Sequence, residues 1–341
     1  MKFIPSRWLI EAFQSWRDRK AERISMDDTN PKQKKRFLKG STRAFLEEAR
    51  HTPGFSLFDF LHGYVYLRWP YLYIGVGTGE HRLSKWIRPL VNIIGKIFVS
   101  SNGDQVEKPT VAETYHGKVV PLNAAKQLVT VQENIQITNL EHIIPYKIAR
   151  DIILQHPDHI AVVDCPCRAY RPNPCLPLDV CLIIGEPFAS LVVEHHPDRS
   201  RWITSEEAQE ILEAEHARGH VSHAYFKDAM LGRFYAICNC CSCCCGAMQA
   251  VRNGSPMIIS SGYVCQLDQE LCIGCEVCID FCQFGALSYQ EDSLSVDDQL
   301  CMGCGVCVSV CPENALSLKL DPERPAPLAI HDLMQDSQFG S

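Results

Sequence analysis

The chain has 341 residues, 46% of them hydrophobic, which suffices for about two domains with buried cores. Its net charge of −7 combines a basic first part, residues 1–100, with an acidic remainder, and the single basic run at 32–36 does not indicate nucleic acid as a partner. Because Glu11 and Gln14 interrupt the apolar start, no secretory signal is expected, and 19 cysteines in a large unexported chain favour metal ligation over a disulfide scaffold.

Residues 1–105 are expected to form a basic, aromatic and mainly helical region. Basic residues surround aromatic ones such as Trp8 and Trp16, which suits docking on a partner or an anionic membrane surface, although packing on the protein's own core explains the pattern equally well. The apolar stretch 61–77 contains Arg68 and Pro70 and is shorter than the ~20 residues of a spanning helix. The sequence therefore predicts no transmembrane segment and a cytoplasmic protein, with peripheral contact to the cytoplasmic face of a membrane as a further expectation.

Residues 106–262 are predicted to form a cysteine-rich domain of α/β or α+β type. The pattern predicts a helix over 139–155 and buried strands at 159–163, 181–185 and 190–194. A further helix is expected to begin at Thr204, which has capping-box spacing to Glu207, and to end at Gly219. No GxGxxG follows a strand, and neither a P-loop nor GxSxG occurs, so nucleotide binding and serine hydrolysis have no support.

A repeated cysteine pattern is the strongest signal in the sequence. Residues 272–287 read CIGCEVCIDFCQFGAL and residues 301–316 read CMGCGVCVSVCPENAL, and both follow C-x2-C-x2-C-x3-C. Three closely spaced thiolates wrap three corners of an iron–sulfur cubane. Gly274 and Gly303 let the loop turn so that backbone N–H groups point at sulfur. Eight cysteines on zinc are the alternative, but zinc sites usually use two CxxC pairs set well apart.

These motifs resemble the bacterial-type ferredoxin domain with two [4Fe–4S] clusters, over residues 263–320, which implies a βαββαβ fold followed by a tail at 321–341. In that family the fourth cysteine of each motif ligates the other cluster. The resemblance implies that cluster 1 is held by Cys272, Cys275, Cys278 and Cys311, and cluster 2 by Cys301, Cys304, Cys307 and Cys282. The family places proline after the fourth cysteine; Pro312 fits and Gln283 departs from it. Cys265 is expected to be an unligated, small apolar residue.

Ten further cysteines form the candidate pool for one or two additional [4Fe–4S] clusters. The pool comprises Cys165, Cys167, Cys175, Cys181, Cys238, Cys240, Cys241, Cys243, Cys244 and Cys245. One tetrahedral metal cannot use six adjacent thiols, so we expect the two groups to meet in space and to serve more than one site. Zinc and a redox-active thiol or disulfide remain alternatives, and spacing assigns no ligand to a particular cluster.

Polar residues near these cysteines carry weaker signals. Arg168 is expected to form a structural salt bridge, with a charge near a cluster or anion binding as the alternative. Five histidines are expected to be solvated or capping, although one could ligate metal or transfer a proton: His195, His196, His216, His220 and His223. No residue is assigned a catalytic role.

A wider resemblance covers roughly residues 110–320. The combination of CPCR and NPC with ICNCCSCCCG, together with TYHGKVVPL at 114–122, is similar to a set of poorly characterised, cysteine-rich, ferredoxin-containing proteins of anaerobic bacteria. This resemblance implies no particular activity.

The sequence thus predicts an iron–sulfur electron-transfer protein, or a subunit of an oxidoreductase complex, rather than a stand-alone enzyme. Its redox partner is expected to be a flavoprotein, a ferredoxin or a membrane oxidoreductase. One alternative is a reductase with a catalytic iron–sulfur centre in the region 165–245, fed by the ferredoxin domain. A second alternative is a redox or iron–sulfur sensor.

Overall fold

The computed structural model describes residues 38–86, 114–148, 150–291 and 293–339. The chain from Gly40 to Ser341 forms one compact unit of mixed α and β structure. The basic, aromatic segment around Trp8 and Trp16 lies outside the described residues, so membrane contact stays a prediction. None of the described helices is both long enough and apolar enough to cross a membrane.

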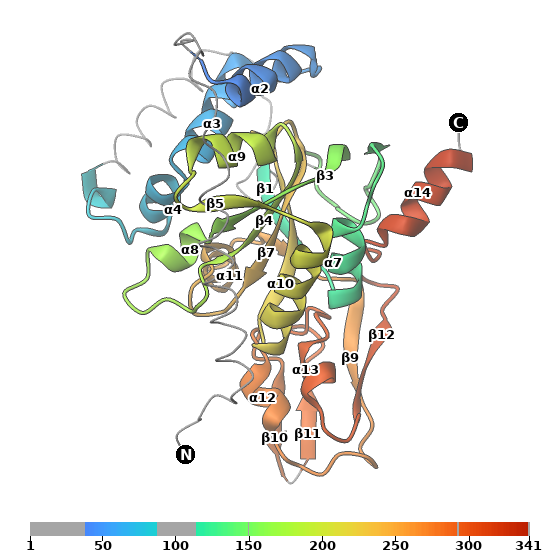
Figure 1. Cartoon of the computed structure of the whole chain (residues 1–341). Helices are drawn as coiled ribbons and strands as arrows, with labels where there is room; N and C mark the ends of the chain where they lie inside the picture. The colour runs from blue at the N-terminus through green and yellow to red at the C-terminus, as the bar shows by residue number, and fades with distance from the viewer. Residues whose placement is uncertain (1–37, 87–113, 149, 292, 340–341) are drawn as a thin grey trace, which may run out of the picture. The chain divides into compact units, whose positions relative to one another are not determined.

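An eight-stranded sheet forms the centre of this unit (Figure 1). Its strands are β1 (Tyr115–Val119), β2 (Ile135–Ile137), β3 (Ile152–Asp164), β4 (Asp179–Glu186), β5 (Ser200–Ile203), β6 (Val221–Lys227), β7 (Arg233–Cys240) and β8 (Ile258–Ile259). The order is β2-β3-β4-β7-β6-β1-β8, with β5 paired to β3. Every pairing is antiparallel except that of β1 with β8, so of the two expected types the central domain is α+β.

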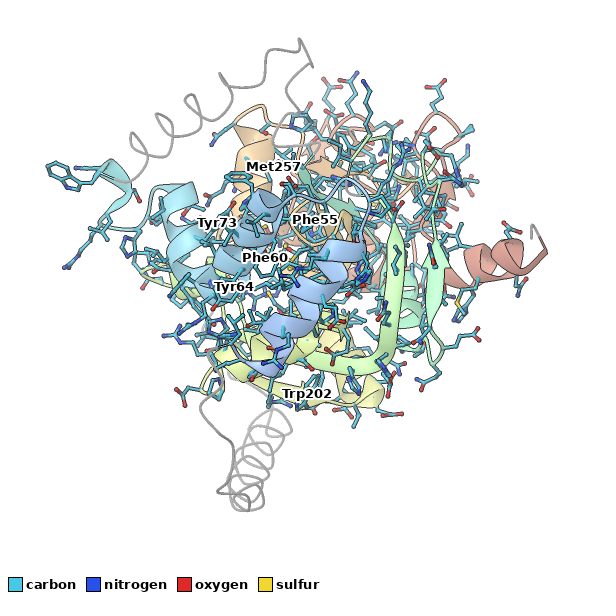
Figure 2. All side chains as sticks on the ribbon, turned by 90° about the horizontal axis from the view of Figure 1, so that it is seen from above. Phe55, Phe60, Tyr64, Tyr73, Trp202 and Met257 are labelled. Atoms are coloured by element: carbon cyan, nitrogen blue, oxygen red, sulfur yellow. The ribbon has the colours of Figure 1, made fainter. Side chains whose placement is uncertain are left out.

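Helices cover both faces of the sheet. One face packs against α7 (Leu122–Val129), α10 (Ser205–Ala217) and α14 (Ile330–Phe339). The other packs against α2 (Gly40–His51), α3 (Leu57–Arg68), α4 (Pro70–Thr78), α8 (Pro166–Ala169), α9 (Phe188–His195) and α11 (Gly246–Arg252). Phe60 of α3 stacks on Tyr64 one turn later, with ring centroids 6.2 Å apart, and also touches Phe45 of α2 (Figure 2). The second face therefore has an aromatic, well-packed cover.

Several predicted elements occur where the sequence placed them. The strands at 159–163 and 181–185 lie within β3 and β4. Thr204 caps α10 by accepting the backbone N–H of Glu207 at 3.2 Å, and Gly219 follows the helix with φ +83°. A left-handed φ of this kind is readily adopted only by glycine, which is why the helix ends there.

Two predicted elements are wrong. The helix expected over 139–155 is absent, because Pro145 breaks the stretch and β3 already begins at Ile152, with alternating burial. The strand expected at 190–194 is part of the helix α9. Phe188, Leu191 and Val192 all lie in the core beneath it, and their spacing of three and four residues is helical.

The C-terminal part has its own small core. Its elements are β9 (Tyr263–Leu267), α12 (Val277–Phe281), β10 (Leu287–Gln290), β11 (Ser293–Val296), α13 (Val306–Val310) and β12 (Leu316–Leu320). The strand β9 pairs with β12, and β10 pairs with β11, both antiparallel. Each cysteine motif runs into one of the two short helices.

The close approach of α3 to the loop after β6 yields a stability prediction. A Cβ on Gly63 would lie 2.1 Å from the carbonyl oxygen of Ala229 and 2.9 Å from Met230, so Gly63→Ala should lower the free energy of unfolding by about 2–3 kcal/mol. Gly77→Ala in α4 is the matched control, because its Cβ would meet nothing within 4 Å and alanine favours a helix. Urea unfolding of both variants under anaerobic conditions tests this packing, and a Gly63→Ala protein as stable as the parent would contradict it.

Candidate metal centres

Strand ends bring distant cysteines together on the aromatic-covered face of the sheet. Cys165 follows the last residue of β3, and Cys181 of β4 is paired directly with Cys238 of β7. Successive side chains of a strand point to opposite faces, so Cys238 and Cys240 share one face. The two cysteine groups of the sequence therefore meet in space, as expected.

These cysteines line a chamber of about 800 Å³ that is predominantly apolar. Its thiol lining consists of Cys165, Cys167, Cys181, Cys238, Cys240, Cys241, Cys244 and Cys245. Tyr66, Tyr115, Tyr225 and Tyr235 also line it. Burial raises the pKa of Tyr225 well above its ordinary value, so this hydroxyl stays protonated and can donate a hydrogen bond. A lining of this kind has the thiol ligands that soft metals favour.

Four chamber thiols form a contiguous set. Interaction with the thiols of Cys167 and Cys181 holds the pKa of Cys165 well below its ordinary value, and interaction with Cys165 and Cys238 raises the pKa of Cys181. The backbone N–H of Gly246 points at Cys167. We call Cys165, Cys167, Cys181 and Cys238 the inner set.

A second pair lies outside the inner set. Cys240 donates to Cys245, and this bond lowers the pKa of Cys245. The hydroxyl of Tyr225 is 4.0 Å from the Sγ of Cys240 and 3.9 Å from that of Cys245. The pair therefore has a proton donor beside it.

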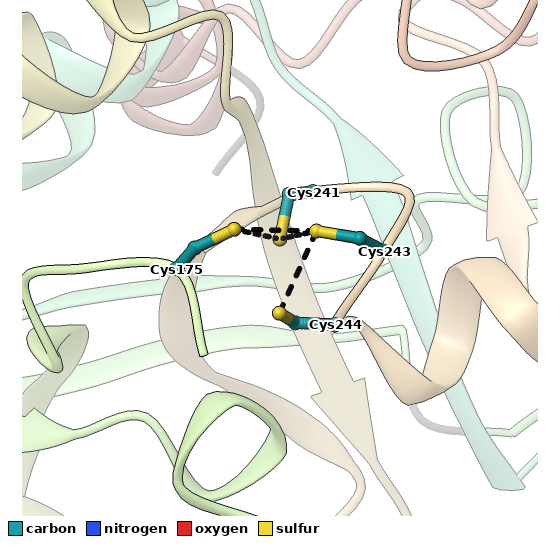
Figure 3. A group of neighbouring side chains, drawn as sticks. All are labelled: Cys175, Cys241, Cys243 and Cys244. Atoms are coloured by element: carbon teal, nitrogen blue, oxygen red, sulfur yellow. Dashed lines mark hydrogen bonds between the residues drawn. The ribbon is translucent and has the colours of Figure 1, made fainter. Parts of the chain in front are cut away.

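Another four cysteines form a compact group at the wall of the chamber (Figure 3). Cys175 comes from the loop before β4, and Cys241, Cys243 and Cys244 come from the loop between β7 and α11. All four Sγ atoms lie within 4.8 Å of one another. We call these residues the outer set; Cys241 and Cys244 also line the chamber, whereas Cys243 is exposed.

Arginines fix the loop that carries the outer set. Arg171 donates to the carbonyl oxygen of Cys244 at 3.2 Å and pairs with Glu80 at 2.6 Å. Arg252 donates to the carbonyl oxygen of Ser242. Two guanidinium groups beside a cluster of thiols offset the negative charge that thiolates would bring.

Arg168 forms a buried ionic group behind the chamber. Its Nη2 lies 2.5 Å from a carboxylate oxygen of Glu215 and 2.9 Å from the carbonyl oxygen of Asn239. Burial opposes the charge on Glu215, yet its hydrogen bonds to His220 and Arg168 hold its pKa below the ordinary value. The expected structural salt bridge of Arg168 is thus confirmed, and it ties α8 to α10 and β7.

The five histidines lie apart from the outer set. His195 bonds Thr42, His196 bonds the carbonyl oxygen of Leu67, His216 bonds Ser309 and His220 bonds Glu215. His223 is fully buried beside Cys238 in the sheet, and burial lowers its pKa to about 4, so its imidazole is neutral at physiological pH. Among the described residues, no histidine joins the four-cysteine group.

The C-terminal domain contains two smaller cavities, of about 390 and 370 Å³. The first is lined by Cys272, Cys275, Cys278 and Cys311, and the second by Cys282, Cys301, Cys304 and Cys307. Each cavity is thus lined by one of the two ligand sets that the ferredoxin resemblance implies. Cys265 also lines the second cavity, with its Sγ 3.6 Å from that of Cys307.

In both motifs a backbone N–H donates a hydrogen bond to the sulfur of the fourth cysteine. The N–H of Ala286 donates to Cys282 and that of Ala315 to Cys311, each at 3.3 Å. At Gly303, φ is +66° and a Cβ would lie 2.2 Å from the carbonyl oxygen of Tyr263, so no other residue fits. Such N–H···S bonds stabilise negative charge on a cluster.

The second cavity faces the chamber-bearing core. Cys304, Met302 and Phe281 pack against that core. Gln283, where the family has proline, accepts the backbone N–H of Ser242 at 2.8 Å. Ser242 lies between two outer-set cysteines, so the departure from the family pattern supplies a hydrogen bond between the two parts.

Comparison with known proteins identifies the C-terminal part alone. Residues 265–318 match the family model of the 4Fe-4S dicluster domain. No curated protein matches the chain. The protein therefore carries a C-terminal dicluster domain for [4Fe–4S] clusters, and a cysteine-rich α+β domain in which the geometry alone describes the sites.

Three features of the site escaped sequence reasoning. These are the division of the ten cysteines, the position of Tyr225 between two thiols, and the bond made by Gln283. A usable signal did exist for β7, because the alternation in ICNC is that of a strand and places Cys238 and Cys240 on one face.

Proposed function

We propose that the protein is an iron–sulfur electron-transfer protein with three clusters. Two belong to the dicluster domain, with cluster 1 held by Cys272, Cys275, Cys278 and Cys311 and cluster 2 by Cys282, Cys301, Cys304 and Cys307. The third is held by the inner set in the chamber. A buried, thiol-lined chamber against a dicluster domain is the observation that carries the proposal.

The donor set of the chamber fits such a cluster. Four contiguous thiols supply the four ligands of a cubane. The space of about 800 Å³ exceeds that of either ferredoxin-type cavity. Its walls are largely apolar and aromatic, and the N–H of Gly246 supports the sulfur of Cys167. When bound, iron–sulfur clusters supply one-electron transfer at potentials that such surroundings tune.

The burial of the ligands suggests an order of the sites. Cys275 of the first cavity is exposed, whereas Cys304 of the second packs against the chamber-bearing core. The protein therefore presents its first cavity to a soluble partner and its second cavity to the chamber. The hydrogen bond from Ser242 to Gln283 is one of the contacts between these two parts.

Reductive titration monitored by EPR tests the proposal. We expect about three one-electron iron–sulfur centres per chain. If only two centres titrate, the dicluster domain accounts for both, and the chamber holds no cluster.

The surface around Cys275 indicates the chemistry of the redox partner. Ile273 is 66% exposed there, next to the exposed side chains of Leu271 and Val277. Exposed carboxylates surround them, namely Glu270, Glu276, Asp280 and Glu313. A basic partner with an apolar contact point fits this rim, and a flavoprotein, a ferredoxin or a membrane oxidoreductase could each provide one.

Charge reversal at this rim should slow electron exchange. We expect the double variant Glu276→Lys/Glu313→Lys to lower the second-order rate with the partner about tenfold at low salt, because it removes electrostatic steering, and the difference should shrink at high salt. Glu133→Lys is the matched control, an exposed carboxylate of the central domain. Stopped-flow rates at two ionic strengths measure the effect, and equal slowing in the control would place docking elsewhere.

A reductase is the second candidate function. Tyr225 and the pair Cys240 and Cys245 lie in the chamber outside the inner set, so a substrate could meet a proton donor and a cluster there. A small molecule that changes the EPR signal of the chamber cluster alone would favour this candidate over plain electron transfer.

A further inference from the structure

The spacing of the outer-set thiols is the starting point. The Sγ atom of Cys243 lies 3.2 Å from that of Cys175, 3.4 Å from that of Cys241 and 3.6 Å from that of Cys244. Cys175 and Cys241 are 3.7 Å apart. The four sulfurs thus form a small, closed polyhedron rather than an open ring.

This spacing matches one tetrahedral ion. Zinc binds thiolate sulfur at about 2.3 Å, so a Cys₄ tetrahedron places its sulfurs about 3.8 Å apart. A [4Fe–4S] cubane places four irons and four sulfides between its thiolates and so holds them farther apart. The four thiols of the outer set lie too close together to surround a cubane unless the two loops that carry them move.

The rest of the protein provides an internal comparison. Among the described residues, neither ligand set of the dicluster domain gathers its four thiols within 4.8 Å; each instead surrounds a cavity. Among the cysteine groups in the described part of the chain, only the outer set has the spacing of a mononuclear site. Four soft thiolate ligands in a tetrahedron suit zinc, and structural zinc sites commonly use this Cys₄ set.

The surroundings suit a structural ion. Four thiolates around a divalent ion leave two negative charges, and Arg171 and Arg252 bind carbonyl oxygens of the same loop. Three of the four cysteines are at least partly buried, and the fourth, Cys243, is exposed, so the ion has an entry path. Every ligand comes from the chain itself, which leaves no open position for substrate.

We propose that Cys175, Cys241, Cys243 and Cys244 bind a single zinc ion. The ion ties the loop before β4 to the loop after β7, and so closes the wall of the chamber that Cys241 and Cys244 line. This site uses no residue of the inner set, so it stands or falls independently of the chamber cluster.

Metal analysis of loop variants tests the proposal. Protein purified anaerobically should contain about one zinc per chain, with zinc K-edge absorption that shows only sulfur neighbours at about 2.3 Å. Cys243→Ser and Cys175→Ser should each lose the zinc and keep iron and acid-labile sulfide unchanged. Both residues lie outside the lining of the chamber, so neither variant removes a chamber thiol.

Ser242→Ala is the matched control on the same loop, because Ser242 contacts its neighbours through the backbone and should keep the zinc. A loss of about four irons with their sulfide in Cys243→Ser would show a cubane and overturn the proposal. Zinc that is absent from the parent, or unchanged in both cysteine variants, would overturn it as well. A variant that fails to fold would lose iron from the dicluster domain too, which the EPR spectrum of that domain reveals.

Discussion

Cys304→Ala should remove cluster 2 and stop electrons from passing between the soluble partner and the chamber. Cys304 lines the second cavity and also packs against the chamber-bearing core. Cluster 2 would therefore lie between cluster 1 and the chamber, where it can pass electrons from one to the other. Iron should fall by about four per chain, because a cubane that loses one of four thiolate ligands is held poorly or not at all. Iron analysis and stopped-flow reoxidation of the reduced protein measure both effects.

The same cavity provides a matched control. Cys265→Ala removes a thiol that lines this cavity but lies outside the four-ligand set, so the iron content should stay at the level of the parent. Full iron and an unchanged electron-transfer rate in Cys304→Ala would show the ligand assignment to be wrong. A loss of iron in Cys265→Ala would add this residue to the ligands.

Cys181→Ala should abolish the chamber cluster and leave the dicluster domain intact. Cys181 is central to the inner set, since its thiol interacts with those of both Cys165 and Cys238. We expect a loss of about four irons per chain and of one EPR centre, with the two signals of the dicluster domain retained. Cys240→Ala is the control, because Cys240 lines the chamber but belongs to the separate pair near Tyr225.

The iron contents of the variants Cys181→Ala and Cys240→Ala separate the proposed function from its alternatives. Unchanged iron in Cys181→Ala would mean that the chamber holds thiols without a cluster, as a redox-active site would. Equal iron loss in both variants would mean that Cys240 is also needed for the chamber cluster, and that the four ligands assigned to it are not the right ones.

The dicluster domain was predictable because its ligands are local in sequence. Three cysteines within seven residues, with a glycine between the first two, encode a loop around a cubane, and the repeat at 301 encodes it again. The grouping of the other ten cysteines was not predictable, because it depends on pairing across the sheet. Cys175 meets Cys241 across 66 residues, and nothing local records that contact.

The errors in secondary structure have a related cause. The stretch 190–194 contains three consecutive apolar residues, two of them β-branched, which favours a strand. Tertiary packing of Phe188 and Leu191 against the core prevails and makes it a helix. Conversely, the apolar pattern over 139–155 favours a helix only if Pro145 is disregarded. This proline is a local signal in the sequence, whereas the pairing of β3 with β2 is known only from the fold. Short apolar runs leave this choice to the rest of the fold.

Gln283 shows what a departure from a family pattern can mean. Proline at this position would offer no acceptor side chain, whereas glutamine accepts the N–H of Ser242 and joins the dicluster domain to the outer-set loop. The sequence identified the departure, and the structure supplies its physical reason.

Iron, acid-labile sulfide and zinc per chain, measured on one anaerobically purified sample, test the central claim most directly. Three [4Fe–4S] clusters predict about twelve irons with a matching amount of sulfide, and the outer set predicts about one zinc. About eight irons would contradict the claim, because the dicluster domain would then account for all the iron and the chamber would hold no cluster.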